Sequence, residues 1–154
     1  MTNNDILRRI RYTFDLDDSK MIAIFAAADF DATRAQISDL LKKDDDPDYK
    51  ECSDTVLAIF LNGFINDKRG RKEGEQPEPE KRLTNNIIFT KLKIALNLKA
   101  DEILDILDMV EVDISKHELS AFFRKSTHKN FRACQDQVLR KFLKGMQLKY
   151  HPDD

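Results

Sequence analysis

The feature that most constrains the fold of this chain is an internal duplication. When the sequence is slid over itself by 82 positions, Thr2 falls on Thr84, and the register holds without a gap until Asn66 falls on Leu148. Sixteen of these 65 positions are identical, and most apolar positions of one copy are apolar in the other. A fixed period of this kind indicates a tandem repeat in which both units bury the same face.

The apolar residues of each copy recur at intervals of three and four, which is the spacing of amphipathic helices. In the first copy, we expect four short helices that begin near Thr2, near Asp17 or Asp18, near Thr33, and near Ser53 or Asp54. No alternating pattern typical of strands competes with this reading. The prediction is an all-α fold of two tandem four-helix repeats, packed with approximate two-fold symmetry so that the fourth helix of each copy contributes to a shared core.

The expected domain boundaries follow the duplication. Residues 1–66 form the first repeat, 67–83 a charged linker, 84–150 the second repeat and 151–154 a tail. The linker holds two Gly and two Pro and almost no apolar residue, so we expect it to be extended by charge and stiffened near Pro77 and Pro79. The sequence leaves open whether the repeats pack within one chain, stand apart or exchange between chains.

Two pairs of residues, one of glycines and one of cysteines, stand out because both copies keep them. Gly63 and Gly145 lie in the middle of a helix, where Gly costs about 1 kcal/mol relative to Ala, so a close helix crossing is expected, with a ligand touching bare backbone as the alternative. Cys52 and Cys134 are expected to be buried thiols rather than a redox pair.

Adjacent asparagines also begin both copies, as Asn3-Asn4 and Asn85-Asn86. We interpret them as helix caps, and recognition of a ligand by the amides is the alternative.

Two long stretches, NNDILRRIRYTFDL at residues 3–16 and DPDYKECSDTVLAIFLNGFINDKRG at residues 46–70, have weaker echoes in the second half. With these stretches the chain resembles the YehS-like family of bacterial proteins, which is built from a duplicated domain of unknown function. The resemblance covers essentially the whole chain. It implies a small bacterial cytosolic protein and assigns no catalytic, cofactor or metal residue.

The residues themselves suggest no catalytic chemistry. An EF-hand starting in the acidic run at Asp44 would need Gly at its sixth position and Glu at its twelfth, but these are Tyr49 and Thr55. The three histidines are scattered, and no phosphate-binding loop or nucleophile–base constellation is present. We therefore expect no metal, no cofactor and no enzyme.

Charge is the most informative functional feature, because it differs between the copies. Residues 1–66 carry a net charge of −5, and residues 84–154 carry +2. The candidate interaction surface combines basic residues of the second copy with an acidic run of the first: Arg124, Lys125, Lys129, Arg132, Arg140, Lys141, Lys144, Asp44, Asp45, Asp46 and Asp48.

Two functions fit such a surface. The first is a cytosolic binding or regulatory adaptor that acts through protein–protein contact or self-association, with the acidic run as one complement of the basic patch. The alternative is nucleic-acid binding, with Phe131 or His128 available for stacking and the KRGRK segment at 68–72 adding charge. Two independently solvated faces without function are a third reading. No segment approaches the length of a membrane span, so no membrane contact is expected.

Overall fold

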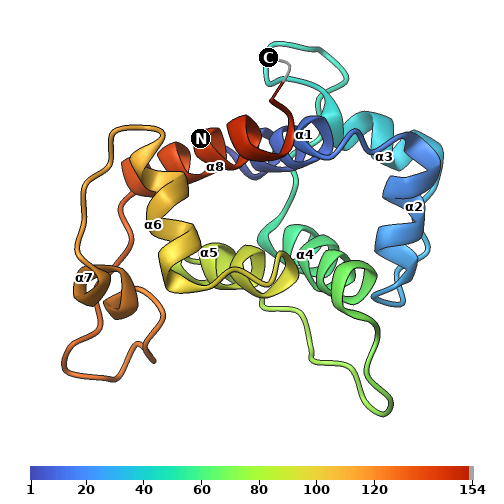
Figure 1. The fold of residues 1–154 in the computed structure, drawn as a ribbon. Coiled ribbons are helices and arrows are strands. Elements are labelled where there is room, and N and C mark those ends of the chain that lie inside the picture. Colours follow the sequence, from blue (N-terminus) through green and yellow to red (C-terminus); the bar gives the residue numbers. More distant parts are fainter. Residues whose placement is uncertain (153–154) are drawn as a thin grey trace.

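The computed structural model describes residues 1–152, and every regular element in that part of the chain is an α-helix (Figure 1). The first repeat contains α1 (Asn3–Thr13), α2 (Asp18–Ala26), α3 (Arg34–Leu41) and α4 (Asp54–Arg69). The second contains α5 (Asn85–Ala95), α6 (Ala100–Asp108), α7 (Lys116–Ala121) and α8 (Asp136–Tyr150). The all-α fold with tandem four-helix repeats is thereby confirmed. Residues 153–154 of the predicted tail lie outside the described residues.

Local capping explains where the helices begin. Thr2 and Thr33 form capping boxes with Asp5 and Gln36, which satisfy backbone N–H groups that the first turn of a helix leaves without partners. The copies also turn identically after their first helices, because Asp15 and Asn97 adopt left-handed φ values of 52° and 53°. The duplication therefore extends from the sequence to the backbone conformation of the loops.

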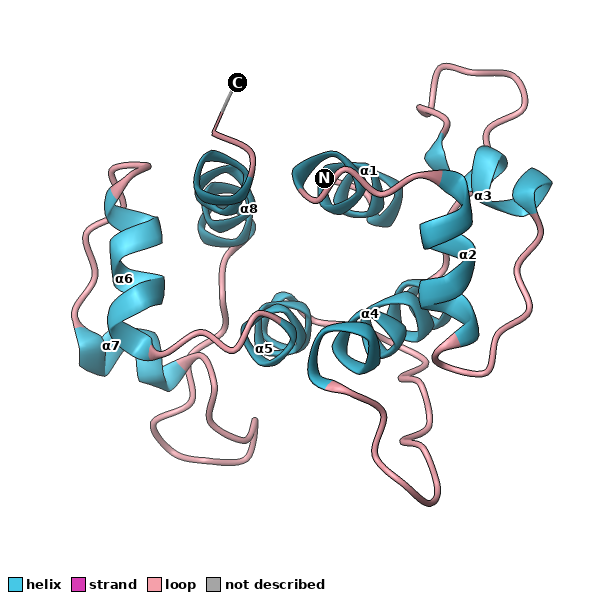
Figure 2. Ribbon diagram, turned by 45° about the vertical axis from the view of Figure 1, so that its right-hand side comes forward, coloured by secondary structure: helices cyan, strands magenta, loops and turns pink. Residues whose placement is uncertain are grey.

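The two repeats pack reciprocally around an internal two-fold axis. Helix α4 of the first repeat lies against α5 of the second, and α8 of the second lies against α1 of the first (Figure 2). Helices α2 and α3 close one end of the molecule, and α6 and α7 close the other (Figures 1 and 2). Both repeats contribute to one continuous core, whose largest fully buried side chains include Phe25, Phe60, Phe64, Phe89 and Phe142. The repeats therefore pack within one chain.

The expected close helix crossings are present at both glycines. A Cβ atom at Gly63 would lie 1.9 Å from the carbonyl oxygen of Ile24 on α2. At Gly145, a Cβ would lie 2.7 Å from both the carbonyl oxygen and the Cγ2 atom of Ile106 on α6. Only a residue without a side chain allows the fourth helix of each repeat to approach the second helix this closely.

The asparagine pairs have a role that differs from the predicted one. Thr2, not an asparagine, caps α1, and Asn4 is buried and ties α1 to the α3–α4 loop. The amide of Asn4 donates to the carbonyl oxygens of Leu40 and Lys50, at 2.9 and 2.8 Å, and its oxygen accepts from the backbone N–H of Cys52 at 2.9 Å. Asn86 makes equivalent bonds in the second repeat. Helix capping was therefore the wrong interpretation for these amides.

The segment between the repeats folds back on the protein. Helix α4 continues to Arg69, three residues beyond the expected boundary at 66, and ends at Gly70, whose φ of 88° favours glycine. Beyond it, Arg71 binds the carboxylate of Asp29 through both of its terminal nitrogens, at 2.7 and 2.9 Å. At the far end, the backbone N–H of Leu83 donates to Asp54 at 2.8 Å. The linker is thus anchored at both ends and lies across the α4–α5 junction.

Candidate functional site

A groove of about 1310 Å³ lies at the α4–α5 junction. We call it the linker groove, because the linker forms one of its walls and the loop between α7 and α8 forms another. Partly exposed apolar side chains also line it, among them Ile65, Leu83, Ile87, Ile94 and Phe131. The groove exists only because the two repeats meet, since α4 belongs to one copy and α5 to the other.

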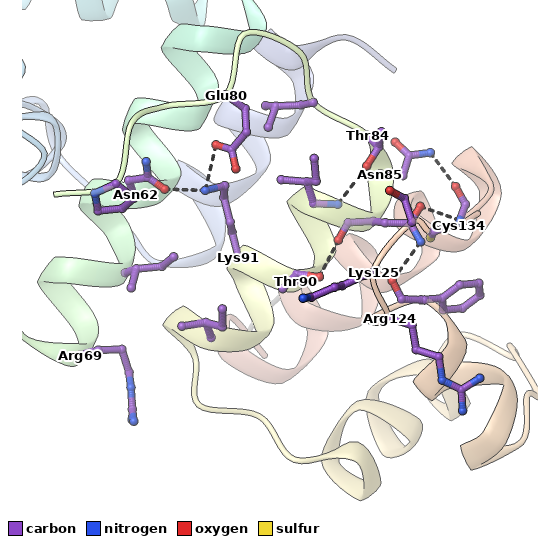
Figure 3. Close-up of a pocket in the computed structure, with 18 of the residues that line it drawn as sticks. Asn62, Arg69, Glu80, Thr84, Asn85, Thr90, Lys91, Arg124, Lys125 and Cys134 are labelled. Atoms are coloured by element: carbon purple, nitrogen blue, oxygen red, sulfur yellow. Dashed lines mark hydrogen bonds and ion pairs between the residues drawn. The ribbon is translucent and has the colours of Figure 1, made fainter. Parts of the chain in front are cut away.

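Lys91 occupies the centre of the polar side of this groove (Figure 3). Its ammonium group donates to the side-chain oxygen of Asn62 at 2.6 Å and lies 3.1 Å from a carboxylate oxygen of Glu80 in the linker. The Lys91 side chain is 12% exposed and the Glu80 side chain 33% exposed, so this ion pair is partly shielded from water. The groove therefore already accommodates a carboxylate, supplied by the chain itself.

Four further cationic side chains line the linker groove. Arg69 and Lys72 come from the end of α4 and the linker, and Arg124 and Lys125 come from the start of the α7–α8 loop. None of the four forms an ion pair with another described residue. Arg124 and Arg69 extend from opposite walls in Figure 3. Two of the acidic residues in the walls, Glu73 and Glu75, are likewise without ion pairs within residues 1–152.

The structure divides the basic residues of the predicted interaction surface among separate places. Arg124 and Lys125 line the linker groove, whereas Arg140 lines a second groove between α1 and α8. Arg132 lies 3.6 Å from Glu118, and Lys129 is exposed in the α7–α8 loop. Lys144 is exposed and Lys141 half-buried on α8. The residues between 124 and 149 thus do not form one patch.

The acidic run lies in the loop between α3 and α4, at the other end of the molecule from the α7–α8 loop (Figures 1 and 2). Asp44, Asp45 and Asp48 are exposed, and the Asp46 carboxylate accepts from the backbone N–H of Asp48 at 2.8 Å. Among the described residues, no ion pair joins this run to the basic residues of the second repeat. The two halves of the predicted surface therefore face different directions within one molecule.

The second groove has a volume of about 560 Å³ and lies where α8 meets α1. We call it the arginine groove. It is the symmetry counterpart of the linker groove, because six of its seven lining residues align in the duplication with residues that line the linker groove. The lining residues are Met1, Asp5, Arg8, Arg9, Tyr12, Arg140 and Gln147.

The two cysteines are buried and free, and they occupy equivalent positions before α4 and α8. Burial raises the pKa of the Cys52 thiol to about 12 and that of Cys134 to about 11. Both side chains are therefore protonated at neutral pH, as expected for buried thiols. Cys134 also lies at the edge of the linker groove.

Other residues singled out in the sequence have ordinary contacts. Phe131 lines the linker groove, whereas the ring of His128 accepts a hydrogen bond from the backbone N–H of Asn130 at 3.0 Å. No three His, Cys, Asp or Glu side chains come together as a metal site within residues 1–152. In the same range, no helix combines the length and apolarity needed to cross a bilayer.

Sequence reasoning missed the ion pair and hydrogen bond that Lys91 forms in the linker groove. Lys91, Asn62 and Glu80 are far apart in the chain, and no motif connects them. The one available signal was the KRGRK segment, of which Arg69 and Lys72 reach the linker groove. Its other members do not: Lys68 lies over the rings of Phe14 and Phe64, and Arg71 pairs with Asp29.

The chain matches known proteins along nearly its whole length. The model of a family described as "Protein of unknown function (DUF1456)" matches twice, at residues 3–70 and 85–151. The uncharacterized protein YehS of Escherichia coli strain K12 is 43% identical over 152 residues, which cover 98% of this chain and 97% of that protein. No solved structure matches the chain.

Proposed function

The chain belongs to the DUF1456 family of unknown function, and from its geometry we propose that it is a cytoplasmic adaptor that acts by binding rather than by catalysis. Its partner is a protein with an exposed segment that combines carboxylates with apolar side chains. The segment binds in the linker groove, where the apolar side chains contact the isoleucines and the carboxylates meet the cations of the walls. Two buried free thiols fit the reducing conditions of a cytoplasm.

The observation that carries the proposal is the Lys91–Glu80 ion pair. The linker places a carboxylate against a nearly buried ammonium group at 3.1 Å, so an acidic chain segment already lies in the groove. Arg69, Lys72 and Lys125 line the same groove and form no ion pairs among the described residues. Carboxylates from a partner can complete this arrangement, because complementary charge fixes register and accelerates association.

The size and lining of the groove favour a peptide segment over a small ligand. A volume of about 1310 Å³ exceeds the roughly 300–1,000 Å³ of ordinary small-molecule sites. Partly exposed isoleucines beneath a charged rim also match the anatomy of protein interfaces, where an apolar centre supplies affinity and a polar rim supplies specificity.

The test is a charge reversal with a matched control. One variant carries Arg69→Glu, Arg124→Glu and Lys125→Glu, all in the linker groove. The control carries Lys43→Glu, Lys81→Glu and Lys129→Glu, which change the net charge equally at exposed positions outside the groove. Tagged proteins are compared by affinity capture from native extract, with and without nuclease.

We expect the wild type and the control to recover the same nuclease-resistant protein partner, and the groove variant to lose it. The circular dichroism spectra of all three proteins should agree, because none of the changed side chains lies in the core. Equal recovery by both variants would refute the proposal. Recovery of nucleic acid that disappears with nuclease or with added salt would instead support the nucleic-acid alternative.

A further inference from the structure

The arginine groove lies at the position equivalent to that of the linker groove but is lined by side chains of different chemistry. Where the linker groove has Ile87 and Ile94, the arginine groove has the equivalent residues Asp5 and Tyr12. Thr90 of the first is matched by Arg8 of the second. The equivalent helix junctions therefore differ in their lining. The linker groove has apolar side chains at positions where the arginine groove has polar and cationic ones.

Only one of the three guanidinium groups that line this groove has an anionic partner among the described residues. Arg8 is held by the carboxylate of Asp5 and donates to the carbonyl oxygen of Lys42 at 2.9 Å. Arg9 and Arg140 form no hydrogen bond or ion pair within the described part of the chain, although Arg9 is half-buried. Two cations thus line one cavity without an anion of their own among residues 1–152.

The comparison with Lys91 shows what is missing. Lys91 is the equivalent of Arg9. In the linker groove, Asn62 accepts a hydrogen bond from Lys91, and Glu80 forms an ion pair with it. The residue equivalent to Asn62 is Lys144, a cation that does not line the arginine groove, and no described carboxylate takes the place of Glu80 beside Arg9. An anionic group bound at this position would supply the compensation that the linker supplies on the other side.

We propose that the arginine groove binds a small phosphate monoester through Arg9 and Arg140. The planar fork of a guanidinium group matches phosphate oxygens with two parallel hydrogen bonds, and the charge assistance makes these bonds strong. A volume of about 560 Å³ suits a ligand of this size.

The ring of Tyr12 lines the same groove, is 45% exposed and stacks on His151 with a centroid distance of 4.5 Å. It offers an aromatic surface beside the arginines, on which the planar group of a nucleoside phosphate can lie. The proposal concerns a site separate from the linker groove, so either proposal can fail while the other stands.

The test is isothermal titration of the full chain with three probes, namely inorganic phosphate, ribose 5-phosphate and adenosine monophosphate. The variant is Arg9→Gln with Arg140→Gln, and the control is Lys43→Gln with Lys129→Gln, which removes two cations elsewhere. Arg140→Gln alone provides a second variant that keeps the fold, because Arg140 is exposed on α8 and contacts no described partner.

We expect saturable binding of at least one probe, weakened at least tenfold in the double variant, weakened measurably in Arg140→Gln and unchanged in the control. Tightest binding of adenosine monophosphate identifies a nucleoside phosphate, and equal binding of the two esters identifies a sugar phosphate. Binding of none of the three probes, or binding that is equal in the wild type and both arginine variants, would overturn the proposal.

Discussion

Gly63 and Gly145 set the distance between two pairs of helices. At Gly63, the space that a Cβ would occupy is filled by the backbone carbonyl of Ile24, which belongs to a neighbouring helix and has no alternative rotamer. At Gly145, one of the two obstructing atoms belongs to the side chain of Ile106, which can adjust. The two positions are equivalent in the duplication but differ in tolerance.

Replacing Gly63 with Ala should therefore lower the free energy of unfolding by about 3 kcal/mol, and replacing Gly145 with Ala by about 1–2 kcal/mol, because overpacking forces the helices apart. Urea unfolding measures both. Gly74→Ala is the control, since nothing lies within 4 Å of its Cβ position and only its φ of 91° opposes the change. Equal stability of Gly63→Ala and wild type would contradict the close crossing.

The buried thiols make stability depend on alkaline pH. Burial raises the pKa of Cys52 to about 12 and that of Cys134 to about 11, from the ordinary thiol value of 9.0. A raised pKa means that the folded state holds the proton more tightly than the unfolded state. The stabilising contribution is therefore complete below about pH 9 and is lost as the pH rises from about 9 to 12.

We expect the free energy of unfolding to decline less steeply between pH 9 and 11 in the variant Cys52→Ala with Cys134→Ala than in the wild type. The comparison of slopes is needed because tyrosine and lysine side chains titrate in the same range. Identical slopes would show that the thiols are not protected by burial. The native wild type should also resist thiol alkylation at pH 8 until it is unfolded.

Local signals explain why helix starts were predictable at the scale of single elements. Thr2, Thr33 and Ser115 each bond a backbone N–H three residues later, so cap and helix are neighbours in sequence. The fold-back of the linker had no such signal. Arg71 follows α4 in the chain but pairs with Asp29, which precedes α3. Glu80 in the linker pairs with Lys91 of the second repeat. Both contacts therefore depend on tertiary packing.

The start of α8 has no side-chain cap. Ser53 caps α4 with its hydroxyl group, whereas the equivalent Gln135 before α8 makes no side-chain capping bond. Gln135 is exposed and already has the extended backbone of a cap, with φ −72° and ψ 153°. Gln135→Ser should raise the free energy of unfolding by about 0.5–1 kcal/mol.

Urea unfolding of this variant is compared with that of Gln137→Ser, which changes the same residue type at an exposed position inside α8 and should be neutral or slightly destabilising. No gain from Gln135→Ser over this control would show that the start of α8 is already satisfied.

For the whole molecule, the duplication predicted two equivalent units and a shared core but not which helices would meet. The apolar faces of α1 and α4 look alike in both copies, so periodicity does not decide whether α4 packs on α1 or on its counterpart α5. Nor could it reveal the two grooves, because their walls come from both repeats. Linear clustering of Arg124 and Arg140 suggested one basic surface, but the fold separates them.

The reciprocal packing predicts that the repeats hold together without a covalent connection. A protease site inserted at Gly74, which is exposed in the linker, allows the chain to be cut after folding. The halves should co-elute in size-exclusion chromatography and separate only in denaturant, because α4–α5 and α8–α1 contacts join them through one core. Halves that separate at micromolar concentration without denaturant would contradict this packing.

Site-specific photo-cross-linking in cells shows whether the linker groove captures an acidic segment of another protein. A photoreactive amino acid replaces Ile94 in the groove, or Met109 outside both grooves as the control, since these side chains are 45% and 49% exposed. We expect an adduct from position 94 alone, which maps to an acidic segment and is lost after Arg69→Glu, Arg124→Glu and Lys125→Glu. The same adducts from both positions, or none from position 94, would contradict the proposed capture.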